Sequence, residues 1–256
     1  MKRNLSKRRP ASLGEQGGLH LLQTVTAGML LGAFCVLTSG CGTAHGKPGP
    51  YPEVARPETV TDFNVLYKDN CVGCHGIDGK AGAAIALNNP VYLSIAGETH
   101  LQQIISNGIP GKLMPAFGRG AGGMLTDQQV MALVSGMLKE WGTSIQLNMD
   151  IPPYAATLPA HVEDGPKAYV IYCARCHGPT GEGNGKLGSI VDPSYLALLS
   201  DQNLRSIVIA GRPDERMPDW RGDAAQPMTD QQITDVVAWM ASKRIINPGQ
   251  PYPARP

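Results

Sequence analysis

The strongest hydrophobic pattern in the chain follows Thr126 and Thr229, where apolar residues recur at three- and four-residue intervals among polar ones. This spacing predicts an amphipathic helix after each threonine. A glutamine stands three residues after each threonine, and the pair forms a capping box that starts a helix. The predicted buried faces are Val130, Leu133, Val134 and Met137 in the first helix, and Ile233, Val236, Val237 and Met240 in the second.

Weaker helical patterns lie upstream of these two helices. Helices are predicted near residues 98–107 and 201–210, ending at Gly108 and Gly211, a residue type that tolerates a left-handed cap. A further helix leads into each cysteine pair, with Phe63, Leu66 and Tyr67 on one side of the first and Tyr169 and Tyr172 on one side of the second. Strand-like alternation is scarce, so the sequence predicts an all-α protein.

The two halves of the chain are copies of one another. Cys71-Val72-Gly73-Cys74-His75 returns 102 residues later as Cys173-Ala174-Arg175-Cys176-His177. From Pro90 onward the matching residues are 103 apart, so the second copy contains one inserted residue. An internal repeat of this kind predicts two domains of the same small helical fold. Further matched pairs are Pro90 with Pro193, Met114-Pro115 with Met217-Pro218, and Thr126 with Thr229.

Stretches rich in proline and glycine divide the chain into segments. We expect a signal segment over residues 1–41, a tether over 42–60, a first domain over 61–148, a linker over 149–160, a second domain over 161–246 and a tail over 247–256.

The N-terminus has the pattern of an export signal. A basic run from Lys2 to Arg9 precedes an apolar stretch at about residues 25–37, which is shorter than the roughly 20 residues of a transmembrane helix. Residues 37–41 resemble the lipobox of bacterial lipoproteins, although Thr38 stands where that motif usually has leucine. We therefore expect a lipid on Cys41 and a location on the periplasmic side of a bacterial membrane. Plain signal cleavage and an uncleaved anchor are the alternatives.

Charge and composition limit the classes of partner and cofactor that the chain can bind. The formal net charge of the whole chain is +1, but removing the signal segment leaves 17 basic and 20 acidic residues, a net charge of −3. No cluster of basic residues follows Cys41, so a nucleic-acid partner is not expected. Aromatic residues make up only 5% of the chain, which leaves room for a large cofactor in the cores.

The cysteine motifs predict that cofactor. Two cysteines on one helical turn can each form a thioether to a haem vinyl group while the following histidine faces the iron. A redox dithiol of the thioredoxin type needs a βαβ frame, and a zinc knuckle needs four ligands in each copy; a structural disulfide is the third alternative. Duplication behind an export signal therefore predicts two covalent haem c groups, held by Cys71, Cys74 and His75 and by Cys173, Cys176 and His177.

The sixth position of each iron needs a second ligand. The candidates in the first copy are Met114, Met124 and His100, and only Met114 is repeated, as Met217. A ligand that the same fold needs twice should appear twice, so Met114 and Met217 are the predicted iron ligands. The other methionines are predicted to pack in the cores, namely Met131, Met137, Met228 and Met240.

On these residues both copies resemble class I cytochrome c domains, and the pair resembles periplasmic di-haem cytochromes of that class over roughly residues 60–245. The resemblance implies a small helical haem pocket with one exposed haem edge, and a role in electron transfer. The spacing from histidine to methionine is 39 and 40 residues, which is short for the class and implies abbreviated loops.

The expected function is that of a membrane-tethered electron carrier, or a cytochrome subunit of a respiratory or photosynthetic chain, with membrane oxidoreductases or other cytochromes as partners. A di-haem peroxidase-like oxidoreductase is one alternative, but it needs an open iron position in one half, and the repeated methionines argue against this. A fixed haem subunit of a dehydrogenase complex is the other.

Overall fold

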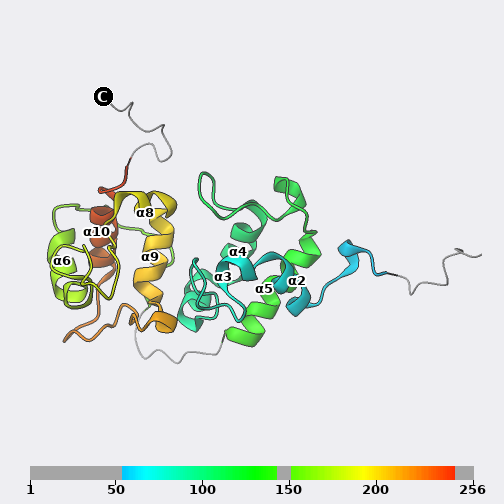
Figure 1. The fold of residues 1–256 in the computed structure, drawn as a ribbon, viewed down its shortest axis with the longest axis horizontal. Helices are drawn as coiled ribbons and strands as arrows, with labels where there is room; N and C mark the ends of the chain where they lie inside the picture. The colour runs from blue at the N-terminus through cyan, green and yellow to red at the C-terminus, as the bar shows by residue number, and fades with distance from the viewer. Residues whose placement is uncertain (1–53, 143–150, 246–256) are drawn as a thin grey trace, which may run out of the picture. The chain divides into compact units, whose positions relative to one another are not determined.

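The computed structural model describes residues 54–142 and 151–245, and the predicted signal segment, Cys41 and the tail lie outside these ranges. The first repeat comprises η2 (Pro57–Thr59), α2 (Phe63–Asn70), α3 (Val72–His75), α4 (Pro90–Asn107), η3 (Arg119–Ala121) and α5 (Asp127–Trp141) (Figure 1). The second repeat comprises α6 (Gly165–Tyr172), α7 (Ala174–His177), α8 (Pro193–Leu198), α9 (Asp201–Ala210), η4 (Pro213–Glu215) and α10 (Asp230–Ala241).

Within the described ranges, β-type pairing is limited to two isolated bridges, Gly118 with Leu125 and Arg212 with Met217. The predicted all-α class is therefore confirmed. None of the helices in these ranges is long and apolar enough to cross a membrane.

The last helix of each repeat begins as predicted. The Thr126 hydroxyl accepts a hydrogen bond from the Gln129 amide at 3.2 Å, and the Gln129 side chain accepts one from the Thr126 amide at 3.0 Å. The same box starts α10, with distances of 3.2 and 2.9 Å between Thr229 and Gln232. All eight residues predicted for the two apolar faces are buried. Met131, expected in the core, is instead 49% exposed, because it lies about 100° around α5 from its neighbour Val130.

The helix expected near residues 98–107 is longer than predicted. It starts at Pro90 and bends at Gly97, whose φ of 65° and ψ of 171° are not helical. The second repeat has two separate helices in this place, α8 and α9. Both repeats end this region at the predicted glycine, and Gly108 and Gly211 have φ of 63° and 68°, although their ψ near 180° is not that of a left-handed helix cap.

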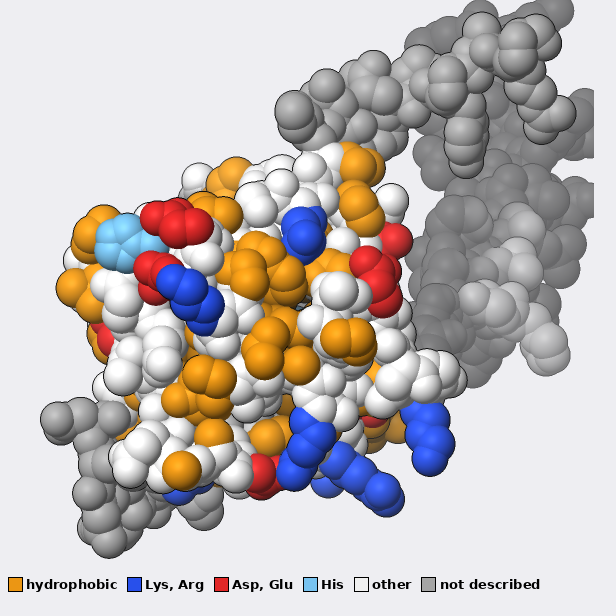
Figure 2. Space-filling model, turned by 90° about the vertical axis from the view of Figure 1, so that its left-hand side faces the viewer, with side chains coloured by type: hydrophobic (Ala, Val, Ile, Leu, Met, Phe, Trp, Pro, Cys, Tyr) orange, Lys and Arg blue, Asp and Glu red, His pale blue; other side chains and the backbone are white. Residues whose placement is uncertain are grey.

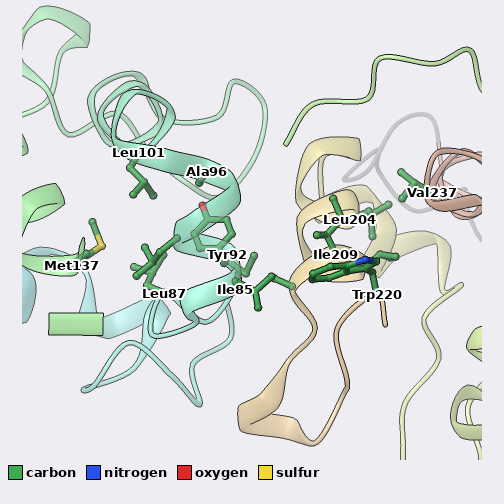
Figure 3. Packing of buried hydrophobic residues seen from close by; sticks show 14 of the residues in the cluster. Ile85, Leu87, Tyr92, Ala96, Leu101, Met137, Leu204, Ile209, Trp220 and Val237 are labelled. Atoms are coloured by element: carbon green, nitrogen blue, oxygen red, sulfur yellow. The ribbon is translucent and has the colours of Figure 1, made fainter. Parts of the chain in front are cut away.

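The helices of each repeat pack around their last helix. In the first repeat α2 and α4 lie against α5, and in the second α6 and α9 lie against α10. Figure 3 shows Leu87 beside Tyr92 in the first core, and Ile209 beside Trp220 in the second. The buried residues of the two repeats form one hydrophobic cluster. The cores of the two repeats are therefore continuous within the described residues.

A buried arginine ties the residues before α6 to the second repeat. Arg205 on α9 is 2% exposed, forms an ion pair with Asp230, and donates a hydrogen bond to the Thr234 hydroxyl at 3.1 Å. Its guanidinium also donates to the carbonyl oxygens of Pro153 and Tyr154, at distances of 2.9 to 3.2 Å. These bonds satisfy a buried charge that would otherwise be costly.

Candidate functional site

Each Cys-x-x-Cys-His motif forms a single helical turn at the end of the preceding helix. The amides of Cys74 and His75 donate to the Cys71 carbonyl at 3.2 and 3.0 Å, and those of Cys176 and His177 donate to the Cys173 carbonyl at 3.1 and 3.0 Å. This turn places the two thiols of a motif on the same side of the chain. In both repeats, two thiols therefore lie on the same side of one helical turn, and the histidine follows the second of them.

The four thiols are free and differ in exposure. Cys74 and Cys176 are exposed, whereas Cys71 and Cys173 are half-buried. Burial, followed by the charge of the neighbouring cysteine, raises the pKa of both Cys71 and Cys173 to about 11. Among the described residues, metal-ligating atoms of three or more side chains converge only at His161, Asp164 and Asp235. The motifs therefore do not have the geometry of a closed zinc site, which needs four converging ligands.

A tyrosine fixes the turn that follows each motif. The Tyr67 hydroxyl donates to the Gly76 carbonyl at 2.8 Å, and the Tyr169 hydroxyl donates to the Gly178 carbonyl at 2.5 Å. The two glycines have φ of 80° and 82°, a conformation that strains other residues. The helix before each motif is therefore hydrogen-bonded to the residue that follows the histidine of the motif.

The two histidines have different surroundings. His75 is buried, and its Nδ1 lies 2.8 Å from the Ile85 carbonyl oxygen, which leaves Nε2 free to bind a metal. The Nδ1 of His177 is also buried, yet it has no hydrogen-bond partner among the described residues. Burial lowers the pKa of both imidazoles, which favours the neutral form that ligates metals.

The predicted methionine ligands lie in loops that are fixed by the same contacts in both repeats. The Ile109 amide donates to the Met114 carbonyl at 2.9 Å, and Arg212 and Met217 exchange two backbone hydrogen bonds at 3.0 and 2.9 Å. A side chain at Gly108 would lie 2.7 Å from the Met114 carbonyl oxygen, and one at Gly211 would lie 2.7 Å from the Met217 carbonyl oxygen. Both glycines are therefore needed for the close approach of the methionine loop.

The other candidates for the sixth ligand are placed differently. Met124 is 83% exposed. His100 is exposed on α4, its Nδ1 bonds to the Ala96 carbonyl oxygen at 2.9 Å, and its ring stacks near Tyr154 at 4.5 Å. Met228 is buried, as predicted for a core residue.

A cavity of about 550 Å³ lies beside Met217. It is bounded by residues of both repeats, and the second cysteine motif does not line it. The cavity therefore borders one predicted ligand and not the attachment residues. Its lining consists of Asn89, Pro90, Val91, Ala210, Pro213, Met217, Pro218, Asp219, Arg221 and Gly222.

Apolar side chains are exposed directly before the second motif. Val170 and Ile171 of α6 are 62% and 60% exposed. Figure 2 shows the face of the molecule that lies on the left of Figure 1, where hydrophobic side chains gather in the middle beside one Lys or Arg and most charged side chains lie nearer the edge. A surface of this kind suits contact with a partner protein.

The residues of both repeats suit a covalently bound haem. Two thiols on one turn match the groups that attach a haem c covalently, and a neutral imidazole and a methionine thioether held in a hydrogen-bonded loop match its iron ligands. The buried Nδ1 of His177 also fits such a site, because ligation through Nε2 requires the hydrogen to sit on Nδ1.

Comparison with known proteins agrees with a haem c protein. The family described as "Cytochrome C oxidase, cbb3-type, subunit III" matches residues 58–135 and 160–240. The cbb3-type cytochrome c oxidase subunit FixP of Sinorhizobium medicae is 26% identical over 133 residues, which are 48% of this chain and 40% of that relative. The chain therefore matches less than half the length of this relative. A chain of the reducing HAO-like protein complex of Kuenenia stuttgartiensis has a TM-score of 0.41 and 17% identity, covering 76% of this chain and 99% of that one.

Proposed function

The chain belongs to the cytochrome c oxidase cbb3-type subunit III family, whose members carry covalently attached haem c, and we propose that it is an electron carrier with two haems of histidine–methionine ligation. Cys71 and Cys74 bind the first haem and Cys173 and Cys176 the second. His75 with Met114, and His177 with Met217, ligate the two irons. The geometry that supports this most directly is the repeated glycine contact that holds each methionine loop.

The bound haems supply one-electron chemistry, and the protein residues set its conditions. The tyrosine hydrogen bonds to the Gly76 and Gly178 carbonyls hold the turn after each motif, and this turn fixes the orientation of the histidine before it. Two protein ligands per iron leave no position for substrate, which favours a carrier over a peroxidase. Buried surroundings limit the rearrangement that accompanies the change of charge.

Partners and location form the second part of the proposal. FixP is named as an oxidase subunit, so we infer that this chain passes electrons to a membrane-bound oxidoreductase of the oxidase type. The exposed apolar side chains of α6 suit the docking of such a partner. We propose a periplasmic location, with a lipid on Cys41 as the membrane anchor.

Mass spectrometry of the intact mature protein tests the attachment and the anchor together. The expected mass includes two covalent haems and acyl groups on Cys41. A Cys41→Ala variant serves as the control, because it should keep both haems and lose the acyl groups. A mature protein without covalent haem would contradict the proposal.

Absorption spectroscopy tests the methionine ligands. A sulfur-to-iron band in the far red is expected in the oxidised protein, and Met114→Ala and Met217→Ala should each remove about half of it. Met124→Ala is the matched control, since this methionine is exposed and should leave the band unchanged. If neither of the first two variants changed the band, methionine ligation would be wrong.

A further inference from the structure

The two repeats differ in the hydrogen bonding of the histidine Nδ1 atom, the ring nitrogen that is not proposed to bind the iron. The Nδ1 of His75 lies 2.8 Å from the Ile85 carbonyl oxygen. The Nδ1 of His177 is as inaccessible to solvent as a core atom, and no described residue accepts its hydrogen. Almost every other buried side-chain polar atom in the described ranges has a partner, so the contrast between the two histidines is specific.

The loop between His177 and Pro193 is hydrogen-bonded differently from the matching loop of the first repeat. The insertion falls between His177 and Pro193, in the segment that matches the one carrying Ile85. There the amide of Asn184 donates to the Leu187 carbonyl at 3.2 Å, and the Asn184 side chain accepts from the amides of Lys186 and Leu187 at 3.1 and 3.0 Å. The Leu187 carbonyl, 102 residues after Ile85, therefore bonds to the Asn184 amide within this turn.

We propose that this difference gives the two haems unequal midpoint potentials, with the first haem lower and the second higher. The proposal rests on the proposed ligation. A histidine that donates from Nδ1 to a carbonyl is a more basic ligand, and a more basic ligand stabilises ferric iron over ferrous iron. His75 has this bond and His177 lacks it, so the equilibrium within the molecule places an electron on the second haem.

Burial acts in the opposite direction and must be separated from the hydrogen bond. His75 is buried and His177 only partly so, and burial disfavours the more highly charged ferric state. The loop that carries the acceptor can be exchanged without changing either motif, because Asn89 and Asp192 both cap the next helix by accepting from the amide three residues on. The exchange therefore changes the hydrogen bond and leaves the methionine loops in place.

A redox titration of the holoprotein tests the proposal. Residues 178–192 are replaced by residues 76–89, which removes the inserted residue. The second haem should then titrate at a lower potential, while the first is unchanged. Met114→His or Met217→His replaces the methionine of one haem and lowers the potential of that haem. The titration step that does not move then belongs to the other haem.

The reciprocal exchange, made with Asn89 kept because its side chain bonds to the second repeat, should raise the potential of the first haem. Nitrogen-15 spectra of the reduced protein provide an independent readout, with the Nδ1 signal of His75 expected to be that of a hydrogen-bonded N–H and the Nδ1 signal of His177 that of an N–H without an acceptor. The proposal is overturned if the first haem has the higher potential, or if the His177 hydrogen proves to be held by an acceptor in the wild type. A protein with two haems and two methionine ligands but inverted potentials refutes only this inference, whereas loss of a haem refutes the proposed function.

Discussion

Asp214 is a single carboxylate that joins the two repeats. Its side chain is 5% exposed, accepts hydrogen bonds from Arg212 at 2.9 and 3.0 Å, and accepts another from the Ala81 amide at 3.0 Å. Arg212 in turn reaches the Gly82 carbonyl at 3.4 Å. Gly82 packs closely against the first cysteine motif, since a side chain there would lie 2.6 Å from the backbone of His75. Through Gly82, the ion pair therefore contacts the loop that lies against this motif.

The charge of Asp214 makes its contribution depend on pH. The hydrogen bond from Arg212 lowers the pKa of this carboxyl below its ordinary value of 3.8. A lowered folded-state pKa means that the stabilisation is present above 3.8 and is lost as the pH falls through the folded-state value. Asp214→Asn should therefore cost about 1–3 kcal/mol of unfolding free energy at pH 7, and the difference from wild type should shrink well below pH 3.8.

Denaturant unfolding of the two proteins at neutral and acid pH measures this difference. Asp223→Asn is the control, because Asp223 pairs with Arg175 on the exposed surface and should cost less than about 1 kcal/mol. A cost for Asp214→Asn that stays constant with pH would show that charge plays no part.

At this scale the proposed haem-binding residues come from the sequence, because cysteine, histidine and methionine at fixed spacing are distinctive. It does not predict the Ile85 carbonyl or the Asp214 contacts. A backbone acceptor has no signature in the residue type. The change of repeat spacing from 102 to 103 residues was the available signal, since it locates the altered loop.

At the scale of the helices, the two repeats pack the same pair of elements with the large and small residues exchanged. Phe63 of α2 lies against Gly136 of α5, where a side chain would overlap the phenylalanine ring. In the second repeat Gly165 of α6 lies against Trp239 of α10. Each crossing therefore has one aromatic ring and one glycine, on opposite helices.

Adding a methyl group at Gly136 should destabilise the protein although alanine favours helices. Overpacking costs about 1–3 kcal/mol and the propensity gain is about 1 kcal/mol, so Gly136→Ala should lose up to about 2 kcal/mol net. Gly120→Ala is the control, because nothing lies within 4 Å of a side chain there. Combining Gly136→Ala with Phe63→Leu should recover part of the loss, and thermal unfolding measures all three variants.

The sequence predicts the later helices well and the earlier ones poorly. α5 and α10 combine a capping box with a continuous apolar face, so local and tertiary signals agree. The first half of α4 was missed because Gly97 interrupts the pattern. Asn89 followed by Pro90 was a usable start signal, since asparagine caps helices and proline favours their first position.

At the scale of the molecule, the repeats contact each other through polar groups as well as the shared core. Asn89 is 1% exposed, caps α4 by accepting from the amides of Val91 and Tyr92 at 3.0 and 3.2 Å, and donates to the Ala210 carbonyl at 2.9 Å. Lys112 donates to the Ala197 carbonyl at 2.6 Å. Duplication and fold class were readable from the sequence, but these contacts were not, because they follow no periodic pattern.

Asn89→Asp separates the two roles of this side chain. The carboxylate still caps α4, but it cannot donate to the Ala210 carbonyl and places a charge beside that oxygen. We expect a loss of about 1–3 kcal/mol and less cooperative unfolding of the two repeats, measured by calorimetry. Asp192→Asn, at the matching cap of α8, should change little, since its side chain is exposed and its cap is retained. Identical unfolding of Asn89→Asp and wild type would contradict the role of this contact.

Arg205 has a practical consequence for anyone who shortens the gene. An expression fragment of the second half that starts at residue 161 omits Pro153 and Tyr154. The buried guanidinium of Arg205 then loses the carbonyl oxygens that accept its hydrogen bonds. A fragment that starts at residue 151 keeps them. The longer fragment should be the one that accumulates in cells.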